Sequence, residues 1–121
     1  MRILIFDDDI ARSPERLIIP PSLEVRIVDR ADECLELVAS FRAASVFMDF
    51  HMNSSLKGDE AIRRLRAYYD KDALTIIGIS SAPSLNQRMI EAGANRAIPK
   101  KDLPDALFEL GLEAEEGPPI P

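Results

Sequence analysis

Short apolar runs, of which residues 3–6 are unbroken, alternate along the chain with longer segments in which apolar residues recur every three or four positions. An unbroken run is typical of a strand buried on both faces, and the wider spacing is typical of a helix with one buried side. The pattern predicts strands at residues 3–6, 25–28, 46–48, 74–79 and 97–98. It predicts helices at residues 10–18, 31–41, 58–69 and 85–92, and a last one from 102 or 105 through 110.

Strands that alternate with helices favour a parallel sheet, because each connection must cross one face of the sheet to reach the next strand. We therefore expect a doubly wound α/β fold with five parallel strands and helices on both faces. The length of 121 residues fits one domain, which we expect over residues 1–112. Residues 113–121 are acidic and Pro-rich without an apolar period, which predicts a tail or the start of a linker.

The composition excludes several classes of function. A net charge of −6 argues against direct binding of nucleic acid or of an anionic membrane surface. The single cysteine, Cys34, cannot form an internal disulfide, and it lies on the apolar stripe of its predicted helix, where we expect it to be buried. No apolar run has the length of a membrane span, so we expect a cytoplasmic protein. With one histidine, His51, chemistry that needs two histidines is excluded.

Polar side chains follow the carboxyl ends of four predicted strands. They are Asp7, Asp8, Asp9, Asp49, Ser80 and Lys100. In doubly wound sheets this edge is where ligands bind. Clustered carboxylates repel one another unless a cation joins them, and their oxygens suit Mg²⁺. A carboxylate can also attack phosphorus, while a cation, a lysine and a hydroxyl neutralise the phosphoryl oxygens. Each aspartate and the serine alone is as typical of a helix cap or a turn, and Lys100 beside Lys101 of a solvated pair, but together they favour phosphoryl chemistry.

Four short motifs, in this order and spacing, resemble the receiver domain of two-component response regulators. They are Ile-Phe-Asp-Asp-Asp at 5–9, Val-Phe-Met-Asp-Phe at 46–50, Ile-Ser-Ser-Ala at 79–82 and Gly-Ala-Asn-Arg-Ala-Ile-Pro-Lys at 93–100. The resemblance extends from residue 3 to about residue 112. It implies a flavodoxin-like sheet order of 2-1-3-4-5. It also implies a phosphorelay function in which a histidine kinase or a histidine phosphotransfer protein donates a phosphoryl group. Catalysis would then be limited to this self-directed transfer and to autodephosphorylation.

The resemblance also implies a role for each polar residue at the sheet edge. Asp49 would be the phosphoacceptor, Ser80 the hydroxyl that turns toward the phosphoryl group, and Lys100 the cation that pairs with it. The ligands of Mg²⁺ would be Asp7, Asp8, Asp49 and the backbone carbonyl of His51, although the acidic pair could equally be Asp8 and Asp9. The phosphorylated chain would switch a surface that a downstream protein or an output domain reads. The chain would then be either a single-domain regulator or a receiver cut from a longer protein.

Two departures from the family pattern and two alternative functions stay open. The loop over residues 50–58 has one extra residue, and Ala97 stands where the family usually has an aromatic ring or a histidine that swings inward. The first alternative is a small phosphohydrolase of the haloacid dehalogenase kind, with Asp7 as nucleophile and Asp9 two residues later. Ala11 and the short chain argue against it. The second is a receiver-shaped interaction module that does not turn over phosphate.

Overall fold

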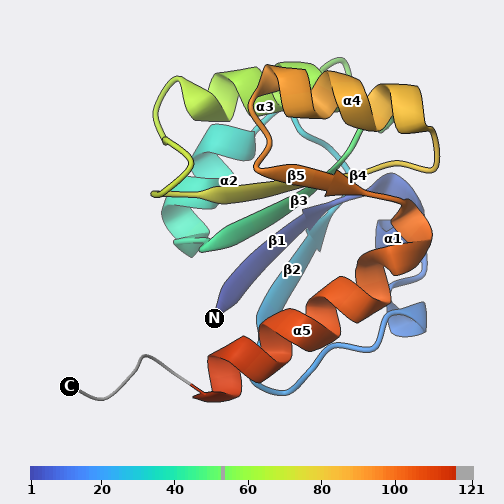
Figure 1. Cartoon of the computed structure of the whole chain (residues 1–121), viewed down its shortest axis with the longest axis vertical. Helices are drawn as coiled ribbons and strands as arrows, with labels where there is room; N and C mark the ends of the chain where they lie inside the picture. Colours follow the sequence, from blue (N-terminus) through green and yellow to red (C-terminus); the bar gives the residue numbers. More distant parts are fainter. Residues whose placement is uncertain (53, 117–121) are drawn as a thin grey trace.

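The computed structural model describes residues 1–52 and 54–116, which form one parallel sheet between two layers of helices (Figure 1). The strands are β1 (Arg2–Phe6), β2 (Glu24–Val28), β3 (Ser45–Asp49), β4 (Thr75–Ile79) and β5 (Arg96–Ile98). The helices are α1 (Asp8–Arg12), α2 (Cys34–Phe41), α3 (Gly58–Arg66), α4 (Pro83–Ala92) and α5 (Leu103–Glu116). The strand order is β2-β1-β3-β4-β5 with every pair parallel, so the expected fold class and order are confirmed.

The two faces of the sheet are buried by different helices. Leu4 and Phe6 of β1 belong to a core shared with α2, α3 and α4. Ile3 and Ile5 of the same strand belong to a second core shared with α5. Alternate residues of a strand point to opposite faces, so an unbroken apolar run satisfies both cores at once. Cys34 lies in the first core and is fully buried, as the sequence predicts, and burial raises the pKa of its thiol.

The first helix differs from its prediction. The expected single helix over residues 10–18 is wrong: α1 begins at Asp8 and ends at Arg12, and a separate 3₁₀ turn covers Pro14–Arg16. The reason is a cap, because Asp7 Oδ1 accepts a hydrogen bond of 3.0 Å from Ile10 N. The acidic run that follows β1 therefore forms the start of the helix. This places the carboxylates of the run at the sheet edge in fixed directions.

The last helix is longer than its prediction. A 3₁₀ turn at Lys100–Asp102 leads into α5, which begins at Leu103 and continues to Glu116. Residues 113–116 are therefore helical, in contrast to the tail predicted there. The partly buried Ala114 packs against the second core, the one shared with α5. The neighbouring glutamates are good helix formers, so this contact is enough to extend the helix by another turn. The rest of the predicted tail, residues 117–121, lies outside the described residues. Within residues 1–52 and 54–116, no helix combines the length and apolar character needed to cross a membrane.

Candidate functional site

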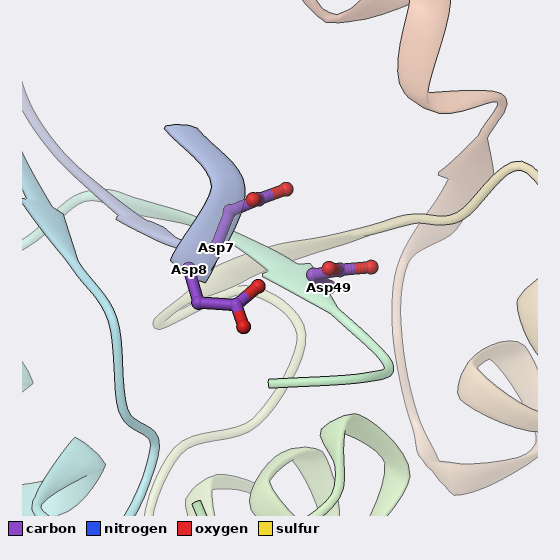
Figure 2. A group of neighbouring side chains, drawn as sticks. All are labelled: Asp7, Asp8 and Asp49. Atoms are coloured by element: carbon purple, nitrogen blue, oxygen red, sulfur yellow. The ribbon is translucent and has the colours of Figure 1, made fainter. Parts of the chain in front are cut away.

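The carboxyl ends of β1 and β3 lie next to each other in the sheet and bring three carboxylates together. Asp7 follows β1, Asp8 opens α1, and Asp49 ends β3. Each contributes a carboxylate oxygen to a group whose atoms all lie within 4.8 Å of one another, and Figure 2 shows the three side chains directed into one space. Asp9 is exposed and is not part of this group. The structure therefore brings Asp7 and Asp8, rather than Asp8 and Asp9, to Asp49.

The donor set of this group fits a divalent cation. Asp7 is completely buried, and its Oδ2 pairs with Lys100 Nζ at 2.7 Å. One lysine does not balance three neighbouring carboxylates, and buried negative charge is costly unless a further cation neutralises it. Three carboxylates offer the hard oxygen ligands that Mg²⁺ prefers. The fourth ligand predicted from the resemblance, the carbonyl of His51, stays a prediction; the His51 side chain is exposed and its ring meets the Phe50 ring edge-on at 5.0 Å.

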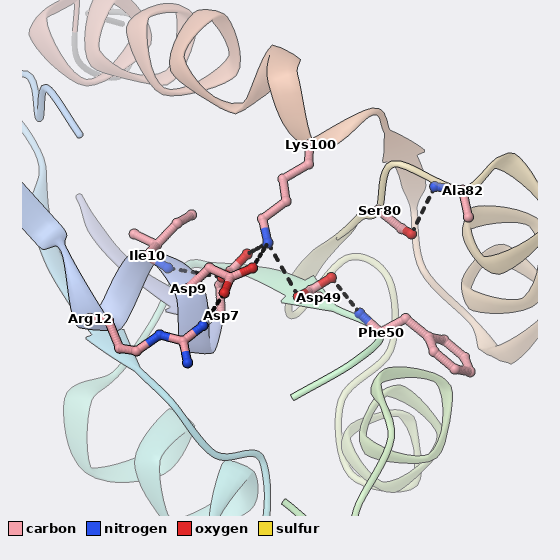
Figure 3. A network of polar contacts seen from close by, with 9 residues as sticks. All are labelled: Asp7, Asp9, Ile10, Arg12, Asp49, Phe50, Ser80, Ala82 and Lys100. Carbon is pink, nitrogen blue, oxygen red and sulfur yellow. Dashed lines mark hydrogen bonds and ion pairs between the residues drawn. The ribbon is translucent and has the colours of Figure 1, made fainter. Parts of the chain in front are cut away.

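Lys100 enters the same space from the turn after β5 (Figure 3). Its Nζ lies 2.7 Å from Asp7 Oδ2, 3.3 Å from Asp9 Oδ2 and 3.5 Å from Asp49 Oδ2. Burial by itself lowers the pKa of this amine, but the contact with Asp7 and the charges of Asp49 and Asp7 outweigh it, so the pKa of Lys100 lies above its ordinary value. The lysine is therefore a permanent cation, held between three carboxylates.

Asp49 is positioned by both of its carboxylate oxygens. Oδ1 accepts a hydrogen bond of 2.9 Å from the backbone N of Phe50, and Oδ2 faces Lys100. The residue is only 7% exposed. Burial, and then the charge of Asp7, raise the pKa of Asp49 from 3.8 to about 6, against the opposing effect of Lys100. At neutral pH the ionised form of this carboxylate is poorly solvated, and an ionised carboxylate is the form that can attack phosphorus.

Ser80 lies at the end of β4 and is buried, but it does not contact the acidic group directly. Its Oγ accepts a hydrogen bond of 3.1 Å from Ala82 N (Figure 3). The side chain therefore caps the turn before α4, which is the role that a serine at a strand end commonly has. A rotation of the hydroxyl would break this one bond, so the group is held weakly enough to change partner.

Sequence reasoning missed two residues, Arg12 and Asn86, that hold the site in place. Arg12 pairs with Asp9, which also faces Lys100, and this arrangement depends on the direction that α1 gives to its first turn. The side chain of Asn86 donates to Ser80 O at 2.9 Å and to Ile98 O at 3.1 Å, which joins the ends of β4 and β5. An amide inside a predicted helix gives no sequence signal for such a bridge.

Comparisons with known proteins place the chain in a family. The sequence profile described as "Response regulator receiver domain" matches residues 3–110. Among solved structures, a putative two-component system response regulator/GGDEF domain protein is 27% identical with a TM-score of 0.74, over 96% of this chain and 50% of its own. NtrX from Brucella abortus is 24% identical with a TM-score of 0.74, over 95% of this chain and 26% of its own.

A third similar structure has nearly the same length as this chain. It is a CheY-like response regulator receiver domain protein from Methanospirillum hungatei, 23% identical with a TM-score of 0.71, over 97% of this chain and 98% of its own. The chain spans half the length of the GGDEF relative. No curated protein sequence matches the chain significantly.

Proposed function

Since the chain belongs to the family of response regulator receiver domains, we propose that it accepts a phosphoryl group on Asp49 from the phosphohistidine of a partner protein. The donor is a histidine kinase or a histidine phosphotransfer protein. The phosphorylated chain then presents a changed surface to a downstream protein or to an output domain. The proposal includes a cytoplasmic setting and no direct contact with nucleic acid or membrane, the expectations stated from the sequence above.

The observation that carries this proposal is that the two carboxylate oxygens of Asp49 have different partners. Oδ1 is held by the N–H of Phe50, which leaves Oδ2 as the attacking oxygen on the side of Lys100. The new bond joins Oδ2 to phosphorus while the P–N bond of the phosphohistidine breaks, and its electron pair leaves with the imidazole. Oδ1 remains as the carbonyl oxygen of the acyl phosphate, still paired with Phe50 N. Loss of the group by attack of water on phosphorus returns the carboxylate.

The neighbouring groups match the needs of this transfer. Asp7, Asp8 and Asp49 would hold Mg²⁺, which neutralises negative charge on the phosphoryl group when it is bound. Lys100 supplies a second cation next to Oδ2. In the product, the hydroxyl of Ser80 leaves Ala82 N and donates to a phosphoryl oxygen. This exchange of one hydrogen bond gives the phosphorylated state contacts that the free state lacks, which a switch requires.

The surface beside Lys100 supports docking of the donor protein. A groove of about 280 Å³ lies between α1 and the start of α5. Ile10, Leu17 and Pro104 give it apolar walls, while Arg16 and Lys101 add positive charge. An apolar groove with basic groups next to the acceptor suits a partner that brings an anionic phosphoryl group.

The alternative with Asp7 as nucleophile has weaker support. Asp7 is completely buried, its Oδ1 caps α1 and its Oδ2 faces Lys100 at 2.7 Å. An incoming phosphoryl group would have to displace one of these contacts, whereas Asp49 Oδ2 has the longer contact of 3.5 Å. The alternative of an interaction module without phosphate turnover predicts no covalent product at all.

Acyl-phosphate labelling separates the three possibilities. The chain is incubated with Mg²⁺ and acetyl phosphate, and intact mass spectrometry is followed by borohydride trapping to locate the modified residue. We expect one base-labile phosphoryl group at Asp49, absent without Mg²⁺ and absent in Asp49→Asn. The matched control is Asp72→Asn, which changes an exposed aspartate on the loop before β4 and should label normally. A label on Asp7, or no label under any condition, would contradict the proposal.

A further inference from the structure

A second set of contacts ties helix α4 to the residue that follows the acceptor. The guanidinium carbon of Arg88, in the middle of α4, lies 4.9 Å from the centroid of the Phe50 ring. Arg88 Nη2 also lies 3.2 Å from Asp59 Oδ2 at the start of α3. We call Phe50, Asp59 and Arg88 the Arg88 link. It joins the residue after β3 to α3 and α4, and Figure 1 shows α3 and α4 side by side over one face of the sheet.

Asp59 is an unusual anchor for a surface helix. The residue is 2% exposed, although the two arginines that face it are mostly exposed. Besides Arg88, its Oδ2 faces Arg63 Nη1 at 3.5 Å, and its Oδ1 accepts from Glu60 N. A buried carboxylate holds its partner more firmly than a solvated one, because water competes less for it. The position of Arg88 is therefore set by a rigid group, and Arg63 provides a second cation that does not touch Phe50.

The start of α3 is packed directly against the acceptor segment. A Cβ on Gly58 would lie 2.3 Å from Asp49 O and 2.8 Å from Phe50 Cα, so only a glycine permits this approach. Gly58 N also donates to Phe50 O at 3.0 Å. Asp59 is the next residue. Asp49, Phe50 and the first turn of α3 consequently form one packed unit, and Arg88 extends this unit to α4.

We propose that Arg88, anchored by Asp59 and stacked on Phe50, is a positioning residue that couples helix α4 to the state of Asp49. This inference rests on the proposed phosphorylation of Asp49. Phe50 is the natural relay, because its N–H donates to Asp49 Oδ1 while its ring carries Arg88. Phosphorylation would turn Oδ1 from a carboxylate oxygen into a neutral carbonyl oxygen, which weakens this hydrogen bond. A change at the acceptor thereby reaches the middle of α4 without an aromatic side chain at position 97, where this chain has alanine.

The link complements the attachment at the other end of the same helix. Ser80 accepts from Ala82 N just before α4, and Asn86 binds Ser80 O. The Ser80 contacts act on the first turn of α4, whereas Arg88 acts on its centre. Coupling between two sites requires an element that both states contact differently. With both attachments, α4 is the element on which phosphorylation of Asp49 would act.

The test compares the response of two segments to a phosphoryl mimic. Backbone amide hydrogen exchange is measured by mass spectrometry on the full chain with Mg²⁺, with and without beryllofluoride. The variant is Arg88→Met, which keeps an apolar side chain over Phe50 but removes the cation. The matched control is Arg63→Met, which removes the other cation from Asp59 and leaves Phe50 untouched. Asp59→Asn is a second test of the link, read only where urea unfolding shows that this buried substitution still folds.

We expect the wild type to respond in both Asp49–Gly58 and Pro83–Ala92. In Arg88→Met the response of the acceptor segment should remain while that of α4 is largely lost. The affinity for beryllofluoride should weaken by about two- to fivefold, the size of one cation–π contact at an exposed site, because Phe50 then holds Asp49 Oδ1 less firmly. Arg63→Met should behave as wild type in both measurements.

Two results would overturn the inference while leaving the proposed function intact. One is a full α4 response in Arg88→Met. The other is an equal loss of the α4 response in Arg63→Met. This result would mean that Arg88 acts only by placing positive charge next to Asp59, as Arg63 does. Failure of the proposed function looks different: beryllofluoride would then leave even the wild-type acceptor segment unchanged.

Discussion

Replacing the carboxylate of Asp49, the proposed acceptor, should make the metal-free protein more stable. Asp49 lies in a buried position, 7% exposed, next to the charge of Asp7. Both effects disfavour the ionised form, which is why the pKa of Asp49 rises from 3.8 to about 6. The substitution Asp49→Asn keeps the shape of the side chain and removes the charge. It should therefore relieve a cost that the folded protein carries at neutral pH.

The size of this cost follows from the pKa. The difference between 3.8 in the unfolded chain and about 6 in the folded protein corresponds to about 3 kcal/mol. Between these two values the folded protein binds more protons than the unfolded chain, so the free energy of unfolding falls as pH rises through this range. The cost is complete above the folded pKa and disappears below the unfolded one. The raised pKa already includes the opposing attraction of Lys100, so about 3 kcal/mol is the net gain expected from removing the charge.

Urea unfolding in EDTA measures the effect directly. At about pH 8 the free energy of unfolding of Asp49→Asn should exceed that of the wild type by roughly 2 kcal/mol or more, and the difference should shrink as pH falls through about 6. Asp72→Asn, on an exposed loop, controls for the loss of one surface charge. Added Mg²⁺ should raise the stability of the wild type and reduce the gain. A gain that is absent at pH 8, or equally large at both ends of the pH range, would refute the reasoning.

Three other substitutions test the remaining contacts. Lys100→Met removes the cation that faces three carboxylates. We expect the free energy of unfolding in EDTA to fall by about 2 kcal/mol, a loss that Mg²⁺ largely restores, and labelling by acetyl phosphate to be slower. A variant that labels at the wild-type rate would contradict the role given to this lysine. Gly58→Ala forces a Cβ to within 2.3 Å of Asp49 O, so urea unfolding should show that the protein is less stable by about 3 kcal/mol. An unchanged stability would mean that α3 can move away from Asp49. Arg66→Ala removes the donors to Gly93 O and to Leu74 O, each at 2.7 Å. Thermal unfolding should show that the protein is less stable by about 2 kcal/mol. The control Arg64→Ala, on the exposed side of the same helix, should change the stability little.

The apolar pattern of this chain determined where its strands lie and that they form a parallel sheet. The run at residues 3–6 is apolar without interruption, and three isoleucines lie close together at residues 76–79. A strand covered on both faces buries every residue of such a run. Helical segments between them leave a parallel sheet as the favoured arrangement. The parallel arrangement in turn brings the residues after each strand to one edge. Asp7, Asp49 and Lys100 could be placed in one site on this basis, before any distance was known.

Local boundaries were less well determined, because they depend on hydrogen bonds of individual side chains. The cap that Asp7 provides to Ile10 N moved the first helix forward to Asp8. Packing of Ala114 against the α5 core extended the last helix beyond the predicted boundary. In each case a single contact, which a sequence pattern does not contain, outweighs weak local preferences.

The tertiary structure alone decided how the charges pair. The direction of α1 turns Asp8 toward Asp49 and leaves Asp9 to Arg12 and Lys100, although the three aspartates are adjacent and chemically identical. The ion pair between Asp59 and Arg88 spans 29 residues and two helices, and nothing in either local sequence indicates it. The sequence sets which chemical groups reach the edge of the sheet. The orientation of each side chain, and with it the roles proposed for these residues, depends on how the helices pack, because ion pairs act over a few ångströms that only the folded chain defines.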